Sequence, residues 1–395
     1  MDAMNKKNCP VCLSPHVGIF FDMHDIPVQC NVLLPTRDEA INVPRGNMRL
    51  GFCPDCGHIY NLAFNPEPME YTQSYENSLH FSPRFQNYAE SLAKDLIERY
   101  DLHNKDVIEI GCGKGDFLRL LCELGHNRGV GFDASYVPER SGKADGERFA
   151  VIQDSYSERY ASYKADFICC RHVLEHIELP RDFLTGVRKS IGDRLKTIVF
   201  FEVPNVLYTL RDLGIWDLIY EHCSYFSSSS LSRLFTSCAF DVHNLNEFYD
   251  GQFLGIETSP RNGIARSTWK PHDDINEMAS LVRAFADNYR SKVDTWRRNF
   301  EGMAVAGKRV VVWGGGSKWI TFLNTLRIQG QVQYMVDVNS RKQGMYVAGA
   351  GQKIVAPEFL REYKPDVVII MNPIYKDEIR QITENLGLKP EYMYG

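Results

Sequence analysis

The hydrophobic pattern of the chain changes its period at several points, and each change marks an expected element. Over residues 83–100, apolar side chains recur at Leu92, Leu96 and Ile97, which is the spacing of one helix face. A short apolar run at residues 106–110 follows and ends in glycines, as a buried strand before a tight turn does. The pattern therefore predicts a helix and then a buried strand.

The glycine-rich turn leads into a second helix. Its apolar positions are Leu118, Leu121, Cys122 and Leu124, and the next apolar run, at residues 128–132, predicts a second strand. Strands that alternate with helices in this way are typical of an α/β fold with a parallel sheet.

The C-terminal third repeats the same alternation. A helix is expected over residues 276–299, followed by an apolar strand, a glycine turn and a helix that begins near Ser317 and Lys318. Two further apolar runs follow. Asp337 at the end of the first does not discriminate between ligands, and Asn372 at the end of the second lies where open α/β sheets bind ligands. We expect a Rossmann-like domain whose helix N-terminus meets a diphosphate, and a purely structural domain is the alternative.

Length and composition limit the class of protein. At 395 residues the chain exceeds one ordinary core, so two or three domains are expected. The net charge of −5 gives no general attraction to nucleic acid or anionic membrane, and no apolar run approaches the roughly 18 residues of a membrane span. The N-terminal residues lack the apolar region of a signal peptide. We expect a cytoplasmic monomer or homodimer without nucleic-acid or membrane partners.

Four of the 11 cysteines are paired at the spacing of metal ligands. Cys9 and Cys12 form one CxxC pair, and Cys53 and Cys56 form a second. Two such pairs complete the tetrahedral sulfur site that structural zinc prefers. The long segment between the pairs must fold back for this to happen, and four unrelated thiols are the alternative. A closed four-ligand site would stabilise the fold and perform no chemistry.

The first glycine turn predicts a nucleotide-cofactor site. Gly111, Gly113 and Gly115 allow a tight turn and the close approach of a ligand at a helix N-terminus. Asp133 ends the next strand, where a carboxylate can bind ribose hydroxyls. A dinucleotide-dependent oxidoreductase and an S-adenosylmethionine (SAM) methyltransferase both use such a turn. Glu109 favours the methyltransferase, because a carboxylate attracts the cationic methionine group and repels a pyrophosphate.

Later segments agree with a class I methyltransferase domain that binds SAM as its cofactor. Asp154 and Ser155 lie where that fold offers polar groups to the adenine. Residues 166–176 resemble its fourth strand and the following turn, and this places His172 beside the cofactor. Residues 200–205 are expected to close the fifth strand over the pocket.

A polar and aromatic segment follows the fifth strand. Glu221 and His222 lie in it beside Tyr220 and Tyr225, so one loop offers a titratable base, a carboxylate to orient it, and phenolic donors. The serine run that follows is a good helix N-cap, so a plain helix start with solvated charges is the alternative. Beside a methyl-donor pocket we favour catalysis, because such residues concentrate at active sites.

Together, the two CxxC pairs, the EIGCGKG turn, and EVPN followed by EHCSYFS resemble the zinc-containing sugar C-methyltransferases. That family methylates nucleotide-linked 4-keto deoxysugars with SAM. The resemblance implies that His222 is the base and that Glu221 is the acid before it. It also implies that Tyr75 and His176 belong to the substrate site. Ile219 occupies a position where the family has a tyrosine.

The resemblance also implies three domains, with zinc and SAM as the bound groups. Their expected boundaries are residues 1–80 for a zinc-binding domain, 81–260 for a SAM-binding methyltransferase domain, and 261–395 for a Rossmann-like substrate domain. The acceptor is then a small molecule, a nucleotide-linked keto sugar, held between the second domain and the third.

The implied chemistry accounts for the residue types. A carbon next to a ketone becomes nucleophilic only when it loses a proton, so the site needs a base and a group that stabilises the enolate oxygen. We expect His222 to be the base, oriented by Glu221, and Tyr75 or His176 to bind the oxygen. An O- or N-methyltransferase is the alternative, and a noncatalytic binding protein is a third possibility.

Overall fold

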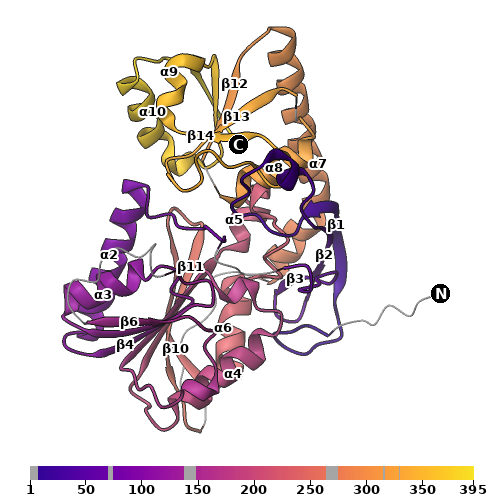
Figure 1. Cartoon of the computed structure of the whole chain (residues 1–395). Helices are drawn as coiled ribbons and strands as arrows, with labels where there is room; N and C mark the ends of the chain where they lie inside the picture. The colour runs from indigo at the N-terminus through magenta and orange to yellow at the C-terminus, as the bar shows by residue number, and fades with distance from the viewer. Residues whose placement is uncertain (1–7, 70–73, 138–147, 264–274, 315, 329) are drawn as a thin grey trace.

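Three β-sheets organise the chain, as Figure 1 shows in a computed structural model. The structure describes residues 8–69, 74–137, 148–263, 275–314, 316–328 and 330–395. In Figure 1 the middle sheet and its helices lie below, the C-terminal sheet lies above, and the N-terminal strands stand beside the long helix α7 (Ile275–Val305).

The N-terminal sheet is antiparallel and has the strand order β1-β2-β3-β9. Its strands are β1 (Gly18–Pro27), β2 (Arg45–Phe52), β3 (Ile59–Asn61) and β9 (Ser224–Tyr225). The short helix α1 (Arg37–Ile41) lies between the first two strands in the chain. The fourth strand comes from the middle of the sequence, so this sheet is not built from the N-terminal region alone.

The β1–β2 hairpin explains how the two cysteine pairs meet despite their separation in the sequence. Gly18 pairs with Phe52 at the open end of the hairpin. Cys12 precedes β1 and Cys53 directly follows β2, so the hairpin returns the chain to its starting point. The fold-back that the sequence requires is therefore present.

The middle sheet has seven strands in the order β10-β11-β8-β7-β4-β5-β6. Five strands are parallel: β4 (Asp106–Ile110), β5 (Arg128–Phe132), β6 (Phe149–Ile152), β7 (Phe167–Arg171) and β8 (Ile198–Pro204). The antiparallel pair β10 (Phe240–Phe248) and β11 (Phe253–Pro260) completes one edge. The strands at 106–110 and 128–132 agree with the sequence prediction.

Helices cover both faces of this sheet, because alternate strand residues are apolar on both sides. Phe167 and Cys169 share a core with α2 (Pro83–Tyr100) and α3 (Asp116–Gly125). Ile168 and Cys170 share a second core with α4 (Pro180–Ile191) and α6 (Ser228–Ser237).

The helix predicted over residues 83–100 is confirmed as α2. One assignment to a helix face is wrong. Leu124 of α3, expected on the apolar face, is 37% exposed because it lies beside the buried stripe of that helix.

The C-terminal sheet is wholly parallel, with the order β14-β13-β12-β15-β16. Its strands are β12 (Val310–Trp313), β13 (Val332–Val336), β14 (Lys353–Val355), β15 (Val367–Ile370) and β16 (Glu391–Tyr394). Its helices are α8 (Ser317–Leu326), α9 (Leu360–Tyr363) and α10 (Lys376–Asn385). This is the Rossmann-like arrangement that the strand–turn–helix pattern predicts.

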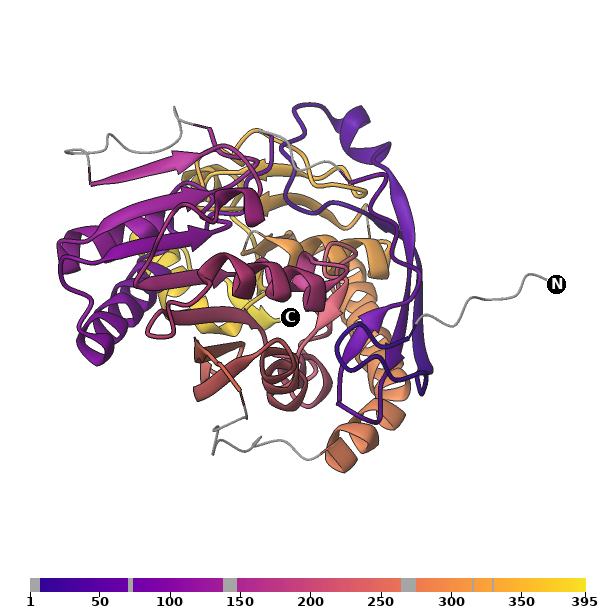
Figure 2. The same cartoon turned by 90° about the horizontal axis from the view of Figure 1, so that it is seen from below.

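The N-terminal and C-terminal sheets share one hydrophobic core. It joins Phe21 and Met48 of the N-terminal sheet to Phe285 and Trp296 of α7 and to Val312 of β12. The segment with the short helix α5 (Val206–Leu210) and Trp216 belongs to the same core. Figure 2 shows the N-terminal strands lying along α7. Helix α7 runs beyond the predicted 276–299 because Phe300 and Met303 continue its buried stripe.

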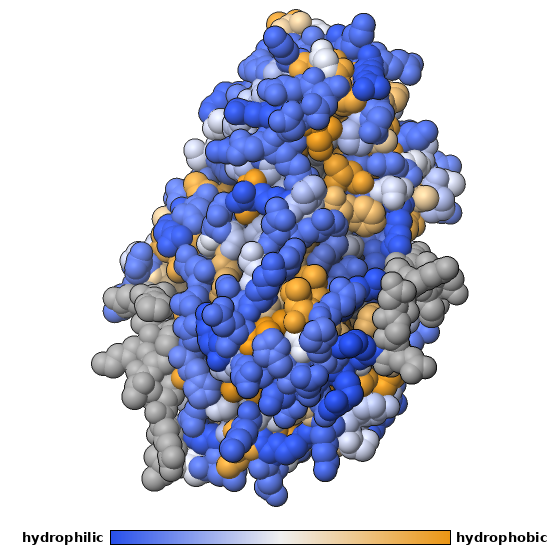
Figure 3. Space-filling view, turned by 90° about the vertical axis from the view of Figure 1, so that its left-hand side faces the viewer, coloured by the Kyte–Doolittle hydropathy of each residue, from blue (hydrophilic) through white to orange (hydrophobic). Residues whose placement is uncertain are grey.

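The face in Figure 3 is mostly hydrophilic, with hydrophobic side chains in small groups. Among the described residues, no helix combines the length and the apolar character that crossing a bilayer requires.

Replacing Phe285 tests the shared core. Its buried ring lies 5.1 Å from the ring of Phe21, measured between centroids. Because losing a large buried ring leaves a cavity, Phe285→Ala should lower the free energy of unfolding by about 3–5 kcal/mol in urea denaturation. Val305→Ala is the control, since Val305 is 91% exposed. A loss below about 1 kcal/mol for Phe285→Ala would contradict the shared core.

Candidate active site

A cavity of about 270 Å³ lies where the three parts of the chain meet. Its walls include Tyr75 from the N-terminal region, Glu109 and His172 from the middle sheet, and Lys318 and Asn372 from the C-terminal domain. The carboxyl ends of the parallel strands β4, β7, β12 and β15 face it, which is where open α/β sheets bind ligands. Of the predicted site residues, the cavity is lined by Tyr75, Glu109, Gly111, Gly113, His172, His176, Glu221 and His222.

The glycine turn forms one wall of the cavity. Gly111 has a φ of +68°, and a Cβ there would lie 2.2 Å from a methyl group of Val173, so a side chain is excluded. Gly113 donates its backbone N–H to Asp133 Oδ2 at 2.8 Å. Asp133 does not line the cavity, but this bond ties its carboxylate to the turn. The arrangement is that of a nucleotide-binding turn with an acid on the neighbouring strand.

Glu109 is a buried carboxylate at this wall. It is 3% exposed, and its Oε2 accepts a 3.0 Å hydrogen bond from the backbone N–H of Leu118. Burial raises the pKa of Glu109 to about 8, and the charge of Arg171 only partly opposes this. A cationic ligand in the cavity would favour the ionised carboxylate. This environment is consistent with the sequence-based expectation that Glu109 lies near the cationic methionine group.

Asp154 and Ser155, expected near the adenine, lie outside the cavity lining. They follow β6, and the Asp154 carboxylate contacts Tyr160 and Arg159. The backbone N–H groups of Asp133 and Asp154 both donate to Ile152 O, so both residues lie at the same end of neighbouring strands. Gly115 also lies outside the lining, at the N-cap of α3.

His172 belongs to a buried charged group that the sequence analysis did not identify. Its Nε2 lies 2.9 Å from Glu202 Oε1, and Arg171 Nη2 donates to the same oxygen at 2.9 Å. Burial opposes a charge on His172, but the carboxylates of Glu175 and Glu202 raise its pKa to about 9. Burial likewise opposes ionisation of Glu202, but the charge of Arg171 together with His172 lowers its pKa to about 2.

His176 and His222 lie side by side, with ring centroids 4.9 Å apart. His176 Nδ1 lies 2.9 Å from the carbonyl oxygen of Glu221. Because a carbonyl only accepts, Nδ1 of His176 carries a proton. The pKa of His222 is well below its ordinary value because of burial and the positive charges of His176, His172 and Lys318.

Glu221 does not orient His222, although the sequence predicts that it would. It is fully buried, and its carboxylate accepts hydrogen bonds from Tyr75 Oη at 2.7 Å and from the backbone N–H of Cys30. In the described residues no hydrogen bond joins this carboxylate to His222. The reason is that His222 N donates to Ile219 O in a tight turn, where adjacent side chains diverge. Glu221 therefore orients Tyr75.

The four paired cysteines gather away from this cavity. Sγ of Cys9 lies 3.6 Å from that of Cys56, and Sγ of Cys12 lies 3.6 Å from that of Cys53. All four sulfurs lie within 4.8 Å of one another. A tetrahedral zinc site with zinc–sulfur bonds of about 2.3 Å needs sulfurs about 3.8 Å apart, so the donor set and spacing fit such an ion.

Several residues at or near the cavity are charged residues within otherwise apolar or glycine-rich segments, a pattern that could have identified them from the sequence. Lys114 is the one charged residue inside the glycine turn, and Arg171 ends the buried strand β7 as a charged residue after an apolar run. Glu202 interrupts the apolar run of β8 and binds Arg171, although it does not line the cavity. Gln252 and Asn372 exchange two side-chain hydrogen bonds of 3.1 and 2.8 Å, which join the middle sheet to the C-terminal domain at the cavity.

The pKa of Glu109 predicts how stability depends on pH. The buried carboxyl titrates near pH 8, whereas an unburied one titrates near 4.5, so the native state loses stability as the pH rises from about 4.5 to 8. Glutamine stays neutral, so Glu109→Gln should raise the melting temperature relative to wild type by several degrees more at pH 9 than at pH 5. Calorimetry of the ligand-free protein measures this difference.

The exposed Glu123→Gln on α3 is the matched control and should show no such pH dependence. A difference between Glu109→Gln and wild type that is equal at the two pH values would refute the assignment.

Two family models match the chain. The model described as a methyltransferase domain matches residues 85–245, and the C-methyltransferase C-terminal domain model matches residues 271–388. The C-methyltransferase NovU of Streptomyces niveus is 25% identical over 313 residues, which are 74% of this chain and 73% of that protein. The dehydrogenase interpretation of the glycine turn is thereby set aside.

Solved methyltransferase structures also align with part of the chain. Magnesium protoporphyrin IX methyltransferase (ChlM) from Synechocystis PCC 6803 with bound SAH aligns at 15% identity and a TM-score of 0.35, over 45% of this chain and 84% of that one. A putative S-adenosylmethionine dependent methyltransferase from Listeria monocytogenes aligns at 13% identity and a TM-score of 0.35, over 45% and 99%.

The strand order of the middle sheet and the family match at residues 85–245 agree on the α/β class I methyltransferase fold. The chain is therefore a SAM-dependent methyltransferase, with a methyltransferase domain in its middle and a C-methyltransferase C-terminal domain after it.

Proposed function

We propose that the chain methylates a carbon next to a ketone of a nucleotide-linked deoxysugar, with His222 as the base. The observation that carries this proposal is the half-buried pair His176 and His222 in the cavity between the glycine turn and the C-terminal domain. A neutral imidazole is the usual protein base for a carbon acid near pH 7.

His222 suits this role because its proton-accepting form dominates. Burial and the neighbouring positive charges lower its pKa, so the ring is neutral at physiological pH. A weakly basic ring removes a proton only with help from groups that stabilise the products. The carboxylates of Glu175 and Glu202 lie on the same side of the cavity, around His172.

The enolate oxygen needs a donor, and the resting hydrogen bonds restrict the choice. The Nδ1 proton of His176 is directed at the Glu221 carbonyl, so this proton is already engaged in the resting arrangement. The hydroxyl proton of Tyr75 is directed at the Glu221 carboxylate. Tyr75 can bind an enolate oxygen only by turning this O–H toward the cavity. We assign it that role because a hydroxyl rotates easily.

The residues around the glycine turn would hold the methyl donor. Glu109 offers a buried negative charge to the cationic methionine group, and Asp133 stands where ribose hydroxyls bind. SAM supplies an electrophilic methyl group bonded to sulfur. The acceptor carbon loses its proton to His222 and forms the new carbon–carbon bond with the electron pair that the proton leaves behind. The carbon–sulfur bond breaks, and S-adenosylhomocysteine is released.

The C-terminal domain supports an acceptor that carries phosphates. Gly316, Ser317 and Lys318 begin α8 at the cavity wall, and this helix N-terminus suits an anion. Lys318 forms an ion pair with Asp217, which lines the same cavity. The similarity to NovU, named as a C-methyltransferase, also favours transfer to carbon.

Solvent-exchange and product assays test the base. Purified protein with SAM and a 4-keto deoxysugar nucleotide should release S-adenosylhomocysteine and exchange the acidic carbon-bound proton with deuterium from D₂O. Because general base catalysis contributes about 10²–10⁴-fold, His222→Ala should lower both rates by at least about 100-fold. Mass spectrometry of the product measures both.

His103→Ala is the matched control, since His103 is exposed on a loop. Methyl transfer without exchange in wild type would favour an oxygen or nitrogen acceptor and overturn the carbon-acid proposal. Full exchange by His222→Ala, with loss in His176→Ala, would assign the base to His176 instead.

We also propose that Cys9, Cys12, Cys53 and Cys56 bind a structural zinc ion. The four thiolates leave no open coordination position, so the ion would hold the N-terminal sheet together and perform no chemistry. Its place beside β3 makes the ion a support for the strand pair β3 and β9, because Cys53 and Cys56 directly precede β3.

Metal analysis tests this site. The purified wild type should contain one zinc per chain, and Cys53→Ser should lose it and melt at a lower temperature. Cys238→Ser is the control, because Cys238 lies outside the cluster, contacts Thr185, and should keep the zinc. A zinc-free wild type prepared with added zinc, or full zinc content in Cys53→Ser, would refute the assignment.

A further inference from the structure

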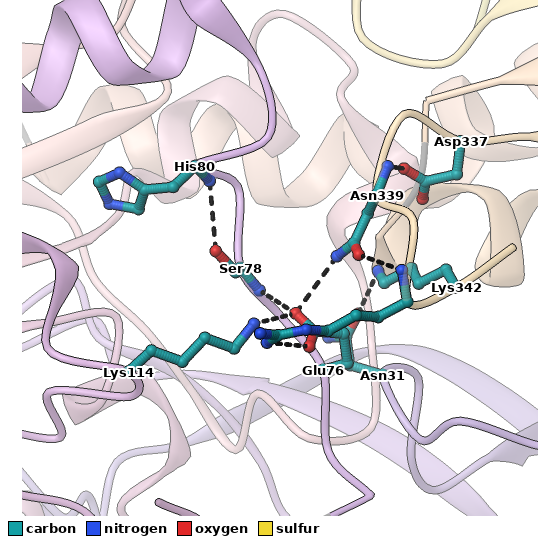
Figure 4. Close-up of polar contacts among 9 residues, drawn as sticks. Asn31, Glu76, Ser78, His80, Lys114, Asp337, Asn339 and Lys342 are labelled. Atoms are coloured by element: carbon teal, nitrogen blue, oxygen red, sulfur yellow. Dashed lines mark hydrogen bonds and ion pairs between the residues drawn. The ribbon is translucent and has the colours of Figure 1, made fainter. Parts of the chain in front are cut away.

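Glu76 connects the three parts of the chain, although it does not line the cavity. Its side chain is fully buried, and the two carboxylate oxygens accept hydrogen bonds from Lys114, Asn339 and Arg341. Figure 4 shows Glu76 at the centre of these contacts, with Lys114 on one side and the Asn339 loop on the other. Buried carboxylates are rare unless they are paired, so this placement requires an explanation.

The first contact reaches the cofactor turn. Lys114 lies between Gly113 and Gly115, and its Nζ lies 2.5 Å from Glu76 Oε1. The side chain of Lys114 is 13% exposed and lines the cavity. The ion pair therefore fixes the glycine turn at Lys114. This residue directly follows Gly113, whose backbone N–H donates to Asp133.

The second set of contacts comes from the loop after β13. Asn339 Nδ2 donates to Glu76 Oε1 at 3.2 Å, and Arg341 Nη1 donates to Oε2 at 3.2 Å. Asn339 is held in turn by its backbone N–H, which donates to Asp337 Oδ1 at 2.8 Å. This loop belongs to the C-terminal domain and lies on the side of Glu76 opposite to Lys114, as Figure 4 shows.

The backbone of Glu76 anchors the group to the N-terminal region. Its N–H donates to Asn31 O at 2.7 Å, and Lys342 Nζ reaches Asn31 Oδ1 at 3.4 Å. Ser78 N donates to Glu76 Oε1 at 3.3 Å, so the carboxylate also stabilises its own loop. The carboxylate is thus held from four directions.

The charge balance shows what the carboxylate contributes. Burial alone would raise the pKa of Glu76, but hydrogen bonds and charge from Lys114, with Asn339 and Arg341, lower it below its ordinary value. The side chain is therefore ionised. Without its charge, the cations of Lys114 and Arg341 would face one another across a neutral group, and the glycine turn would lose its fixed partner.

We propose that Glu76 is a positioning residue that couples the cofactor turn to the C-terminal domain through Lys114 and Arg341. A change in the C-terminal loop then alters the affinity for the methyl donor, although Arg341 does not line the cavity. The coupling lets the C-terminal domain influence the donor site. It rests on SAM dependence alone and requires no assumption about the acceptor.

Calorimetric titration with S-adenosylhomocysteine tests the coupling. Arg341→Met should weaken binding by about 3- to 10-fold, which is the size of effect that a coupled network transmits. Lys114→Met and Glu76→Gln should weaken it at least as much. In the Glu76→Gln background, Arg341→Met should have no further effect, because its connection to the turn is already broken.

Arg290→Met is the matched control, since Arg290 forms only an exposed ion pair with Asp287 on α7. It should bind S-adenosylhomocysteine like wild type. Arg341→Lys, which keeps a cation, should restore part of the affinity. These single variants decide the question even if Glu76→Gln does not fold.

The opposite outcomes are distinct. If Arg341→Met lowers the melting temperature but binds S-adenosylhomocysteine as wild type does, the group is structural and the proposal is wrong. An effect of Arg341→Met that persists in full in the Glu76→Gln background would also overturn it. Absence of binding in wild type would instead contradict SAM dependence itself.

Discussion

The pairing of β9 with β3 is the contact on which the candidate active site depends. Ile59 pairs with Tyr225 and Tyr60 with Ser224, and Asn61 N donates to Cys223 O at 2.9 Å. These bonds fix the backbone directly after His222 in the N-terminal sheet. The backbone that carries His222 is therefore held by the N-terminal sheet, while its side chain lies at the cavity beside the methyltransferase domain.

Neighbouring groups decide the charge of each buried carboxylate around the cavity. Glu202 is ionised because Arg171 and His172 outweigh the cost of burial, whereas Glu109 has only a backbone donor and holds its proton to about pH 8. Glu221 is bound by neutral donors, a phenol and an amide. Glu202 is therefore a counter-ion of Arg171 and His172. Glu109 is a neutral group that a bound cation would ionise, and Glu221 orients Tyr75.

The sequence predicted the repeating parts of this structure well. The strand–turn–helix units, the long helix near residue 276 and the gathering of four cysteines all depend on local period or spacing, which sequence displays directly. It also grouped Tyr75, His176 and His222, through a family resemblance, into what is one cavity wall.

What it could not predict depends on contacts between distant segments. The direction of the Glu221 side chain depends on the turn at His222 and on its hydrogen bonds with Tyr75 and the backbone of Cys30. The contacts of Glu76 involve residues from both ends of the chain, and Asp154 stands outside the cavity because of where β6 ends. The hydrophobic periodicity of a sequence does not indicate contacts between distant segments, because these contacts form only when the sheets pack together.

The shared core has a consequence for synthesis on the ribosome. The strands β1 to β3 emerge long before α7, yet their apolar face is covered by Phe285 and Trp296 of that helix. The nascent N-terminal sheet also lacks its fourth strand until residue 225 has emerged. The N-terminal strands are thus translated well before the residues that complete their packing. During that interval they expose apolar surface of the kind that chaperones bind.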